Sequence, residues 1–302
     1  MAIVTAENIS KSYNIKAVEN INFEIAENEL FGFIGPDGAG KTTIFRILTT
    51  LLIPDSGSVS ICGLNTITNY KSIRELLGYM PGRFSLYQDL SVEENLNFFA
   101  TIFGTTIEEN YDLIKDIYSH IEPFKTRPAG KLSGGMKQKL ALSCALIHKP
   151  KVLILDEPTT GVDAVSRKEF WQMLKELQKK GITIVVSTPY MDEAGMCDRV
   201  ALIQKGRIMR IDTPTNITKS FGEELLSVRA SNMYKLKNDL IQIDLCKSAY
   251  LFGQHIHYTS KTKISENELK IQLENAGNTD VEVALTEPGI EDCFMKLMGE
   301  NQ

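Results

Sequence analysis

The chain has 302 residues, a net charge of −5, and a composition in which 43% of the residues are hydrophobic and 24% are charged. This is the composition of a globular protein with room for one large and one small domain, and it excludes a disordered or fibrous chain. The negative charge speaks against a protein that coats nucleic acid, and the lack of a membrane-length apolar run or an N-terminal signal pattern predicts a cytosolic protein.

Strand-length apolar runs open the sequence, and a helix-forming segment follows them. The runs cover residues 3–9, 21–25 and 30–34, with polar turns between them. From Lys41 the apolar residues take helical spacing, and Pro54 stops the pattern. A strand joined to a helix by a glycine-rich loop is the geometry of a phosphate-binding site.

The loop between that strand and that helix fits the pattern G-x-x-x-x-G-K-[ST]. Glycines let the backbone curl so that successive N–H groups face a phosphate. In such a loop the lysine reaches the β- and γ-phosphates, and the last hydroxyl group coordinates Mg²⁺. We therefore predict an ATP-Mg²⁺ site in which Lys41 contacts phosphate and Thr42 contacts the metal ion. The residues of the loop are Gly35, Pro36, Asp37, Gly38, Ala39, Gly40, Lys41 and Thr42.

The middle of the chain shows only helical periodicity, from about residue 91 to 149. This predicts a helical subdomain over about 85–150, inserted between two strands. Near its end, Ser133 is expected to cap a helix, and Gly134 and Gly135 are expected to leave the helix N-terminus open to a phosphate. By itself Ser-Gly-Gly is an ordinary turn, and it becomes informative only because it follows the phosphate loop in the sequence.

A continuous apolar run at 152–155 predicts a strand that is buried on both faces, and two carboxylates follow it. Asp156 is expected to hold Mg²⁺ through water, and Glu157 to act as general base on the attacking water. A helix at about 164–180, a strand at 182–187 and a strand pair ending near 211 complete the predicted mixed sheet.

A boundary is expected near residue 222, which gives domains of 1–222 and 223–302. In the second domain the predicted order is strand, helix, strand, strand, helix, strand and a trailing helix, which is typical of a small ferredoxin-like domain. The whole chain is thus expected to be an α/β P-loop protein with a helical insertion and a small C-terminal α+β domain. The expected elements are 225–230, 233–241, 243–250, 254–259, 265–276, 280–285 and a helix from 288.

The phosphate loop, the Ser-Gly-Gly run and the strand acids, in this order, resemble the ABC ATPases over nearly the whole chain. The resemblance implies that Tyr13 stacks on adenine, that Thr43 belongs to the phosphate loop, and that Asp163 lies in the family's D-loop. In that family two ATPase domains meet head to tail, and the signature Ser-Gly-Gly of one closes over the ATP of the other. The segments 35–43, 129–139 and 286–294 are similar to ATPases of ABC-2-type drug and sodium exporters, especially the first half of tandem-ABC versions.

Two positions depart from the family's pattern. Gly82 stands where the family usually has a glutamine that contacts Mg²⁺ and the attacking water and relays the state of the site to the membrane subunit. Pro189 stands where the family usually has a histidine that contacts the γ-phosphate, and proline offers neither a donor side chain nor a backbone N–H. We expect ATP binding to persist and hydrolysis at this chain's own loop to be slow, unless another residue such as Arg83 substitutes.

These features predict the ATP-binding subunit of an ABC-2-type exporter at the inner face of the cell membrane, coupling ATP binding and hydrolysis to transport. The expected partners are an integral membrane permease and a second ABC ATPase domain, with no nucleic acid. A different partner chain is favoured, because both sites of a homodimer would be impaired; a homodimer stays open. The alternative is a soluble ABC-type module in which ATP binding clamps a partner without transport, although the chain has no second ABC domain and no basic patch.

Overall fold

The computed structural model describes residues 1–300, and the chain divides into two compact units. The first unit runs from Met1 to Pro214, and the second begins at Thr215. The boundary was predicted near residue 222, whereas in the structure the transition lies at helix α7 (Pro214–Lys219). Among the described residues, no helix combines the length and the apolar character that crossing a membrane requires.

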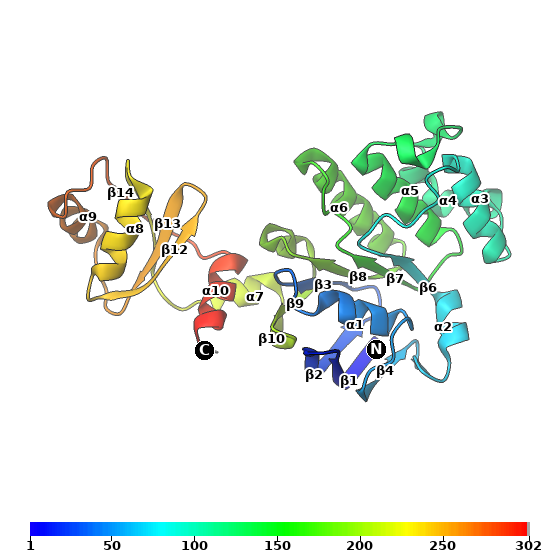
Figure 1. The fold of residues 1–302 in the computed structure, drawn as a ribbon, viewed down its shortest axis with the longest axis horizontal. Helices are drawn as coiled ribbons and strands as arrows, with labels where there is room; N and C mark the ends of the chain where they lie inside the picture. Colours follow the sequence, from blue (N-terminus) through cyan, green and yellow to red (C-terminus); the bar gives the residue numbers. More distant parts are fainter. Residues whose placement is uncertain (301–302) are drawn as a thin grey trace. The chain divides into compact units, whose positions relative to one another are not determined.

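Two sheets form the first unit, with helix α1 (Lys41–Leu48) packed between them (Figure 1). An antiparallel sheet has the strand order β2-β1-β4-β5, and a mixed sheet has the order β10-β9-β3-β8-β7-β6. The strands are β1 (Ala2–Ser12), β2 (Lys16–Ala26), β3 (Leu30–Ile34), β4 (Ser56–Ile61), β5 (Leu64–Asn65), β6 (Leu77–Met80), β7 (Val152–Asp156), β8 (Thr183–Thr188), β9 (Arg199–Gln204) and β10 (Arg207–Asp212).

The centre of the mixed sheet is parallel and fully buried. Strand β3 pairs in parallel with β8 and β9, and β7 pairs in parallel with β6 and β8. Every residue of β3, β7 and β8 is buried, which explains the continuous apolar runs that predicted the first two. Because these strands are parallel, the loops that follow them all begin at one edge of the sheet.

Helix α1 is fixed to the mixed sheet by aromatic packing. The ring of Phe45 on α1 meets the ring of Phe33 on β3 edge-on, with the centroids 5.6 Å apart. Ile44 and Leu48 on the same helix are also buried in the core between the two sheets. The loop between β3 and α1 is therefore held at both ends by packed elements.

Helical elements fill the interval between β6 and β7, as the periodicity predicted. Helices α3 and α4 begin at complete capping boxes, Ser91 with Glu94 and Thr106 with Glu109. Trp171, the only tryptophan of the chain, is 2% exposed on α6. The helices of this unit other than α1 are α2 (Tyr70–Leu76), α3 (Val92–Ile102), α4 (Ile107–Tyr118), α5 (Gly134–Leu146) and α6 (Ala164–Lys179), with short 3-10 turns at Glu122–Phe124, Ala129–Lys131 and Met191–Met196.

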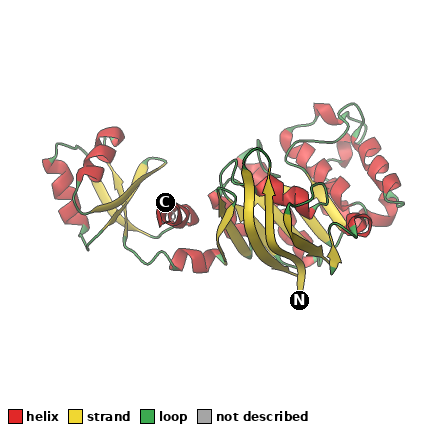
Figure 2. Ribbon diagram, turned by 60° about the horizontal axis from the view of Figure 1, so that its bottom comes forward, coloured by secondary structure: helices red, strands yellow, loops and turns green. Residues whose placement is uncertain are grey.

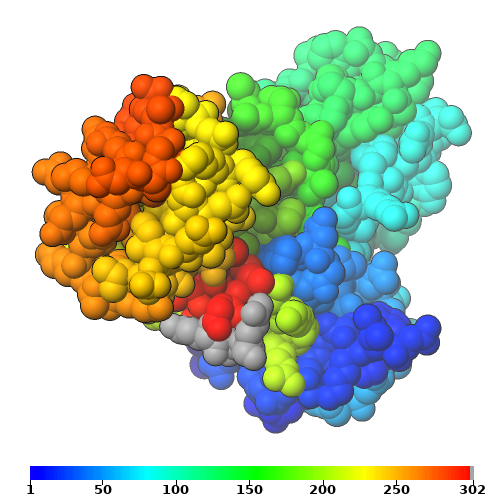
Figure 3. Space-filling view, turned by 60° about the vertical axis from the view of Figure 1, so that its left-hand side comes forward, coloured from blue at the N-terminus to red at the C-terminus, as the bar shows by residue number. Residues whose placement is uncertain are grey.

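The second unit has the predicted order of strands and helices. Its sheet has the order β12-β13-β11-β14, and every neighbouring pair is antiparallel, which is the ferredoxin-like arrangement. Helices α8 and α9 cover one face of this sheet (Figure 2) and form much of the unit's visible surface in the space-filling view (Figure 3). The elements are β11 (Leu225–Arg229), α8 (Met233–Gln242), β12 (Cys246–Phe252), β13 (His255–Ser260), α9 (Glu266–Asn275), β14 (Glu282–Thr286) and α10 (Ile290–Glu300).

Candidate functional site

The glycine-rich loop leaves the carboxyl end of β3 and enters α1. Gly40 is the N-cap of α1 with φ of 106°. The first-turn N–H groups of an α-helix have no intrahelical partner, and in α1 no side chain caps them either. A Cβ atom at Gly40 would lie 2.7 Å from the Ala17 carbonyl oxygen, and one at Gly35 would lie 2.2 Å from the Ile203 carbonyl oxygen. The packing of the loop therefore requires glycine at both positions.

Lys41 carries the charged side chain of the predicted phosphate loop, and this side chain is deeply buried. Its side chain is 3% exposed, and its Nζ donates hydrogen bonds to the carbonyl oxygens of Gly35 at 2.8 Å and Pro36 at 3.0 Å. The same Nζ lies 3.1 Å from Oε1 of Glu157. An ammonium group beside an open helix N-terminus suits a phosphate, because both carry positive charge or partial charge.

The two strand acids lie at the same edge of the sheet. Asp156 is buried, and its Oδ1 accepts a hydrogen bond from Oγ of Ser187 at 2.6 Å. The backbone N–H of Glu157 donates to Ser187, to Oγ at 2.9 Å and to the carbonyl oxygen at 3.1 Å. Glu157 has φ of 49°, a left-handed conformation that is uncommon outside glycine and clusters at functional sites.

The oxygen donors at this edge suit Mg²⁺, which takes one or two protein oxygens together with phosphate oxygens and water. Thr42 is half-buried in the first turn of α1, and Asp156 ends β7. Within residues 1–300, no group of three or more His, Cys, Asp and Glu side chains is arranged to hold a metal ion by itself. A metal ion at this edge would therefore take most of its ligands from the nucleotide and from water.

Gly82 lies directly beside the buried aspartate. A Cβ atom at this position would be 3.1 Å from the carbonyl oxygen of Asp156 and 3.9 Å from its carboxyl carbon. A longer side chain here would thus start next to the predicted metal ligand, and glycine places no functional group there. The neighbouring Arg83 side chain is exposed and lines the groove described below.

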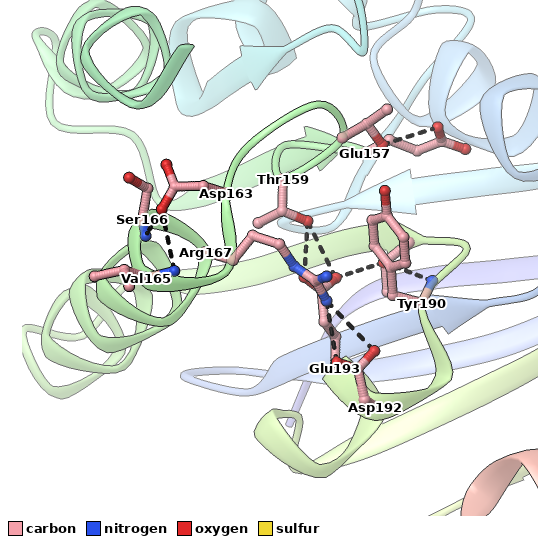
Figure 4. Close-up of polar contacts among 11 residues, drawn as sticks. Glu157, Thr159, Asp163, Val165, Ser166, Arg167, Tyr190, Asp192 and Glu193 are labelled. Atoms are coloured by element: carbon pink, nitrogen blue, oxygen red, sulfur yellow. Dashed lines mark hydrogen bonds and ion pairs between the residues drawn. The ribbon is translucent and has the colours of Figure 1, made fainter. Parts of the chain in front are cut away.

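The segment after β8 is organised by a buried carboxylate that the sequence analysis did not identify (Figure 4). Glu193 is 3% exposed and accepts hydrogen bonds from Oγ1 of Thr159 at 2.8 Å, Oγ1 of Thr188 at 2.5 Å and Nε of Arg167 at 3.0 Å. The Arg167 guanidinium also lies over the Tyr190 ring at 4.1 Å and reaches Asp192 at 3.1 Å. We call this set of six residues the Glu193 clasp. No local sequence motif predicts this cluster, because its members lie on three separate segments of the chain.

The Ser-Gly-Gly run packs against the segment that contains Asp163. Ser133 caps α5 by accepting a hydrogen bond from the Met136 N–H at 3.3 Å, and Ser133 and Gly134 are exposed. A Cβ atom at Gly135 would lie 3.0 Å from Oγ of Ser166, so the two segments touch. Asp163 caps α6, and its bond from the Ser166 N–H is the largest of the contacts that hold the pKa of Asp163 below its usual value.

Tyr13 lies in the turn between β1 and β2 and is 55% exposed. The turn is closed by a hydrogen bond from the Tyr13 N–H to the Ile15 carbonyl oxygen at 2.9 Å. Ala17, four residues further along, is the residue whose carbonyl faces Gly40. The predicted adenine contact thus lies in the turn that leads into β2, the strand whose Ala17 carbonyl approaches the phosphate loop.

A largely apolar groove of about 390 Å³ extends from Glu157 along the segment 79–86 and the helices α3 and α5. Its wall includes Phe84, Phe99 and Phe103, and the Phe103 ring stacks on His148 with centroids 3.8 Å apart. The His148 Nε2 lies 2.9 Å from the Leu77 carbonyl oxygen, and burial lowers the pKa of His148. The residues on either side of Gly82 therefore link the strand acids to an open apolar surface.

Comparison with known proteins gives consistent matches. Residues 18–160 match the family model described as "ABC transporter". The "Nod factor export ATP-binding protein I" of Burkholderia lata is 32% identical over 99% of this chain and 98% of its own length. The "Probable multidrug ABC transporter ATP-binding protein YbhF" of Escherichia coli K12 is 36% identical over 99% of this chain, which spans 52% of that relative's length.

A solved structure supports the same assignment for the first unit. The ATP-binding cassette MJ0796, described as dimeric, in a post-hydrolysis state and bound to ADP and Pi, superposes with a TM-score of 0.63 and 27% sequence identity. The superposition covers 70% of this chain and 98% of that chain.

Proposed function

Because the chain belongs to the ABC transporter family of ATP-binding proteins, we propose that it is the ATP-binding subunit of an ABC-2-type membrane exporter. The observation that carries this proposal is the meeting of Lys41, the open N-terminus of α1 and Glu157 at one edge of the sheet. In this proposal the loop 35–43 holds the phosphates of ATP, Tyr13 stacks on adenine, and Thr42 and Asp156 hold Mg²⁺. The names of the relatives, a probable multidrug ABC transporter ATP-binding protein and a Nod factor export ATP-binding protein, favour export.

We infer that hydrolysis at this chain's own loop is slow. Glu157 is in place to accept a proton from a water that attacks the γ-phosphate, and bound Mg²⁺ would neutralise the charge that develops on the phosphate oxygens. Positions 82 and 189 add no donor or acceptor side chain to that reaction. A positioned group of this kind is typically worth about 10²–10⁴ in rate, so two missing groups leave binding with little turnover.

A second ABC ATPase domain is the proposed partner across the exposed signature. Ser133, Gly134 and Asp163 are exposed beside one another, and Val165 next to them is 70% exposed. A partner's nucleotide would meet this surface, as the head-to-tail family dimer implies. We propose a different chain as the partner, because its unimpaired loop facing this intact signature would supply most of the turnover.

The membrane permease is proposed to dock on the apolar groove. The segment 79–86 lines this groove, and the family resemblance assigns the relay to the membrane subunit to the same segment. In this proposal the protein lies on the inner face of the membrane. If the chain is instead a soluble module, it should copurify with ribosomes or nucleic acid rather than with an integral membrane protein.

Titration calorimetry with MgATP tests the nucleotide site. We expect the wild type to bind and Lys41→Ala to bind at least about 100-fold more weakly, because it loses charge-assisted bonds to the phosphates. Lys180→Ala is the matched control, since it removes an exposed lysine paired with Asp116 at 2.7 Å, and it should bind like the wild type. Absence of binding heat in the wild type would contradict the proposal.

The asymmetry is tested in the complex with the partner ATPase. We expect Glu157→Gln in this chain to leave most of the turnover, and the corresponding change in the partner to abolish it. The reverse result would show that this chain's own site does the work.

A further inference from the structure

The Glu193 clasp connects the end of β8, which contacts the phosphate loop, with helix α6, which lies near the signature run. Thr188, which ends β8, binds Glu193 through its side chain and accepts a hydrogen bond from the Gly35 N–H at 3.3 Å through its carbonyl oxygen. Arg167, which binds Glu193 from α6, directly follows Ser166, whose Oγ would lie 3.0 Å from a Cβ atom added at Gly135. Hydrogen bonds from Gly35 to Thr188, Glu193 and Arg167, followed by the close approach of the neighbouring Ser166 to Gly135, therefore lead from the first residue of the phosphate loop to the signature run.

The clasp resists being pulled apart. Glu193 is a buried carboxylate, and removing one of its donors leaves a desolvated charge with fewer partners, which is costly. Two of its donors, Thr159 and Thr188, belong to the segments that follow β7 and end β8, so neither segment can shift without breaking a bond to the shared carboxylate. The segments 157–163 and 188–193 should consequently move together.

Arg167 is the element that ties this pair of segments to α6. Its Nε binds Glu193, its terminal nitrogen binds Asp192, and its flat face covers Tyr190. Three simultaneous contacts of this kind need a planar guanidinium, which a lysine cannot replace. The contacts also leave this side chain engaged with the segment that carries Pro189, where the family's histidine is missing.

We propose that Arg167 is a positioning residue that transmits nucleotide occupancy of the phosphate loop to this chain's own signature run, through Glu193 and Thr188. The inference rests on the proposed function, because it requires ATP at residues 35–43. Pro189 has no side-chain group that could contact the nucleotide. The coupling therefore runs through the hydrogen bond between the Gly35 N–H and the Thr188 carbonyl oxygen. ATP that is bound and slowly hydrolysed then keeps the signature presented to the partner's ATP.

Amide hydrogen exchange on the full chain, with and without saturating MgATP, tests the inference. In the wild type we expect MgATP to slow exchange at least about threefold in peptides covering 133–138 and 159–168, because the nucleotide-bound loop opens less often. In Arg167→Ala we expect the MgATP dissociation constant to stay within about twofold of the wild type, and the change at 133–138 to vanish. Lys175→Ala is the matched control, since it breaks an ion pair of 3.0 Å on the same helix, with Asp198, away from the clasp.

The outcomes separate the inference from the proposed function. If the wild type does not bind MgATP, the proposed function fails. If it binds but exchange at 133–138 does not change, or if Arg167→Ala keeps that change, the transmission through Arg167 is wrong. Should Arg167→Ala fail to fold, Arg167→Lys takes its place, because lysine keeps the charge but lacks the planar guanidinium. We expect this variant to bind MgATP and to lose the exchange response at 133–138. A full response at 133–138 would overturn the inference.

Discussion

Two regions of the first unit meet at the carboxyl edge of the mixed sheet, and they are built in different ways. The phosphate loop and the β7 acids are held by backbone packing and by buried bonds, with Lys41 3.1 Å from Glu157. Positions 82 and 189 themselves contribute no functional side chain: Gly82 lies beside Asp156, and Pro189 directly follows β8. Binding depends on a shape that the whole core supports, whereas hydrolysis depends on single side chains at loop positions, so one can be lost without the other.

Restoring the missing side chains should give the largest effect. We expect Gly82→Gln combined with Pro189→His to raise ATP hydrolysis by this chain about 100-fold, because each supplies a positioned group near the phosphate. The MgATP dissociation constant should change only a few-fold. The double variant Gly82→Ala with Pro189→Ala is the control, since it brings the same Cβ contact with the Asp156 carbonyl without either functional group. Steady-state phosphate release that is equal in the two double variants would show that these positions do not limit the rate.

Damage to the other region should instead reduce binding. Gly40→Ala places a Cβ atom 2.7 Å from the Ala17 carbonyl oxygen at φ of 106°, and we expect MgATP binding to weaken about 30-fold. Gly38→Ala is the matched control: its φ is 76°, nothing lies within 4 Å of the added atom, and it carries only the conformational cost of about 1–2 kcal/mol. Calorimetric titration of both variants measures the difference. Equal affinities would mean that the close approach to Ala17 does not shape the loop.

A serine shared by the two regions should have an intermediate effect. Ser187→Ala removes the hydrogen bonds of its Oγ with Asp156 and with the Glu157 N–H, and we expect the free energy of unfolding to fall by about 1–2 kcal/mol. Ser143→Ala removes an equally buried hydroxyl that bonds to the Lys139 carbonyl oxygen within α5, and should cost less because the helix keeps its own bonds. Thermal unfolding followed by calorimetry compares the two. A larger loss of unfolding free energy for Ser143→Ala than for Ser187→Ala would argue against a special role of Ser187 in holding Asp156 and Glu157.

The smallest expected effect concerns pH. Burial lowers the pKa of His148 below its usual 6.5, so the unfolded chain takes up this proton at a higher pH than the folded chain. Stability contributed by the neutral ring is therefore present above pH 6.5 and decreases as the pH falls through 6.5 toward the lower pKa of the folded state. Melting temperatures between pH 7.5 and 5.5 should fall less in His148→Gln than in the wild type. Parallel curves would show that this ring does not titrate differently on unfolding.

The sequence predicted those elements whose composition alone decides their structure. The apolar runs of β3 and β7 and the glycines of the phosphate loop were sufficient, and so was the alternation of strands and helices in the second unit. Strands β4 (Ser56–Ile61) and β6 (Leu77–Met80) were not predicted. The first has only two apolar residues, and the second has four residues including Gly78 and depends on parallel pairing with β7.

The candidate site was predictable to the same degree. That Lys41 and Glu157 lie close together follows from their places after two parallel strands of one sheet. The left-handed conformation of Glu157 and the Glu193 clasp were not predictable, because both are produced by tertiary contacts. Thr159, Thr188 and Glu193 are separated by up to 34 residues along the chain and meet only when β7 and β8 pair.

The single tryptophan is an intrinsic fluorescent probe of the first unit only. Because Trp171 is buried on α6, its fluorescence emission should shift when the first unit unfolds. The emission should not change when only the C-terminal unit unfolds. Circular dichroism, in contrast, sums the backbone of both. Recording the two spectra along one urea gradient would reveal whether the units denature in a single cooperative step or one after the other, without attaching any dye.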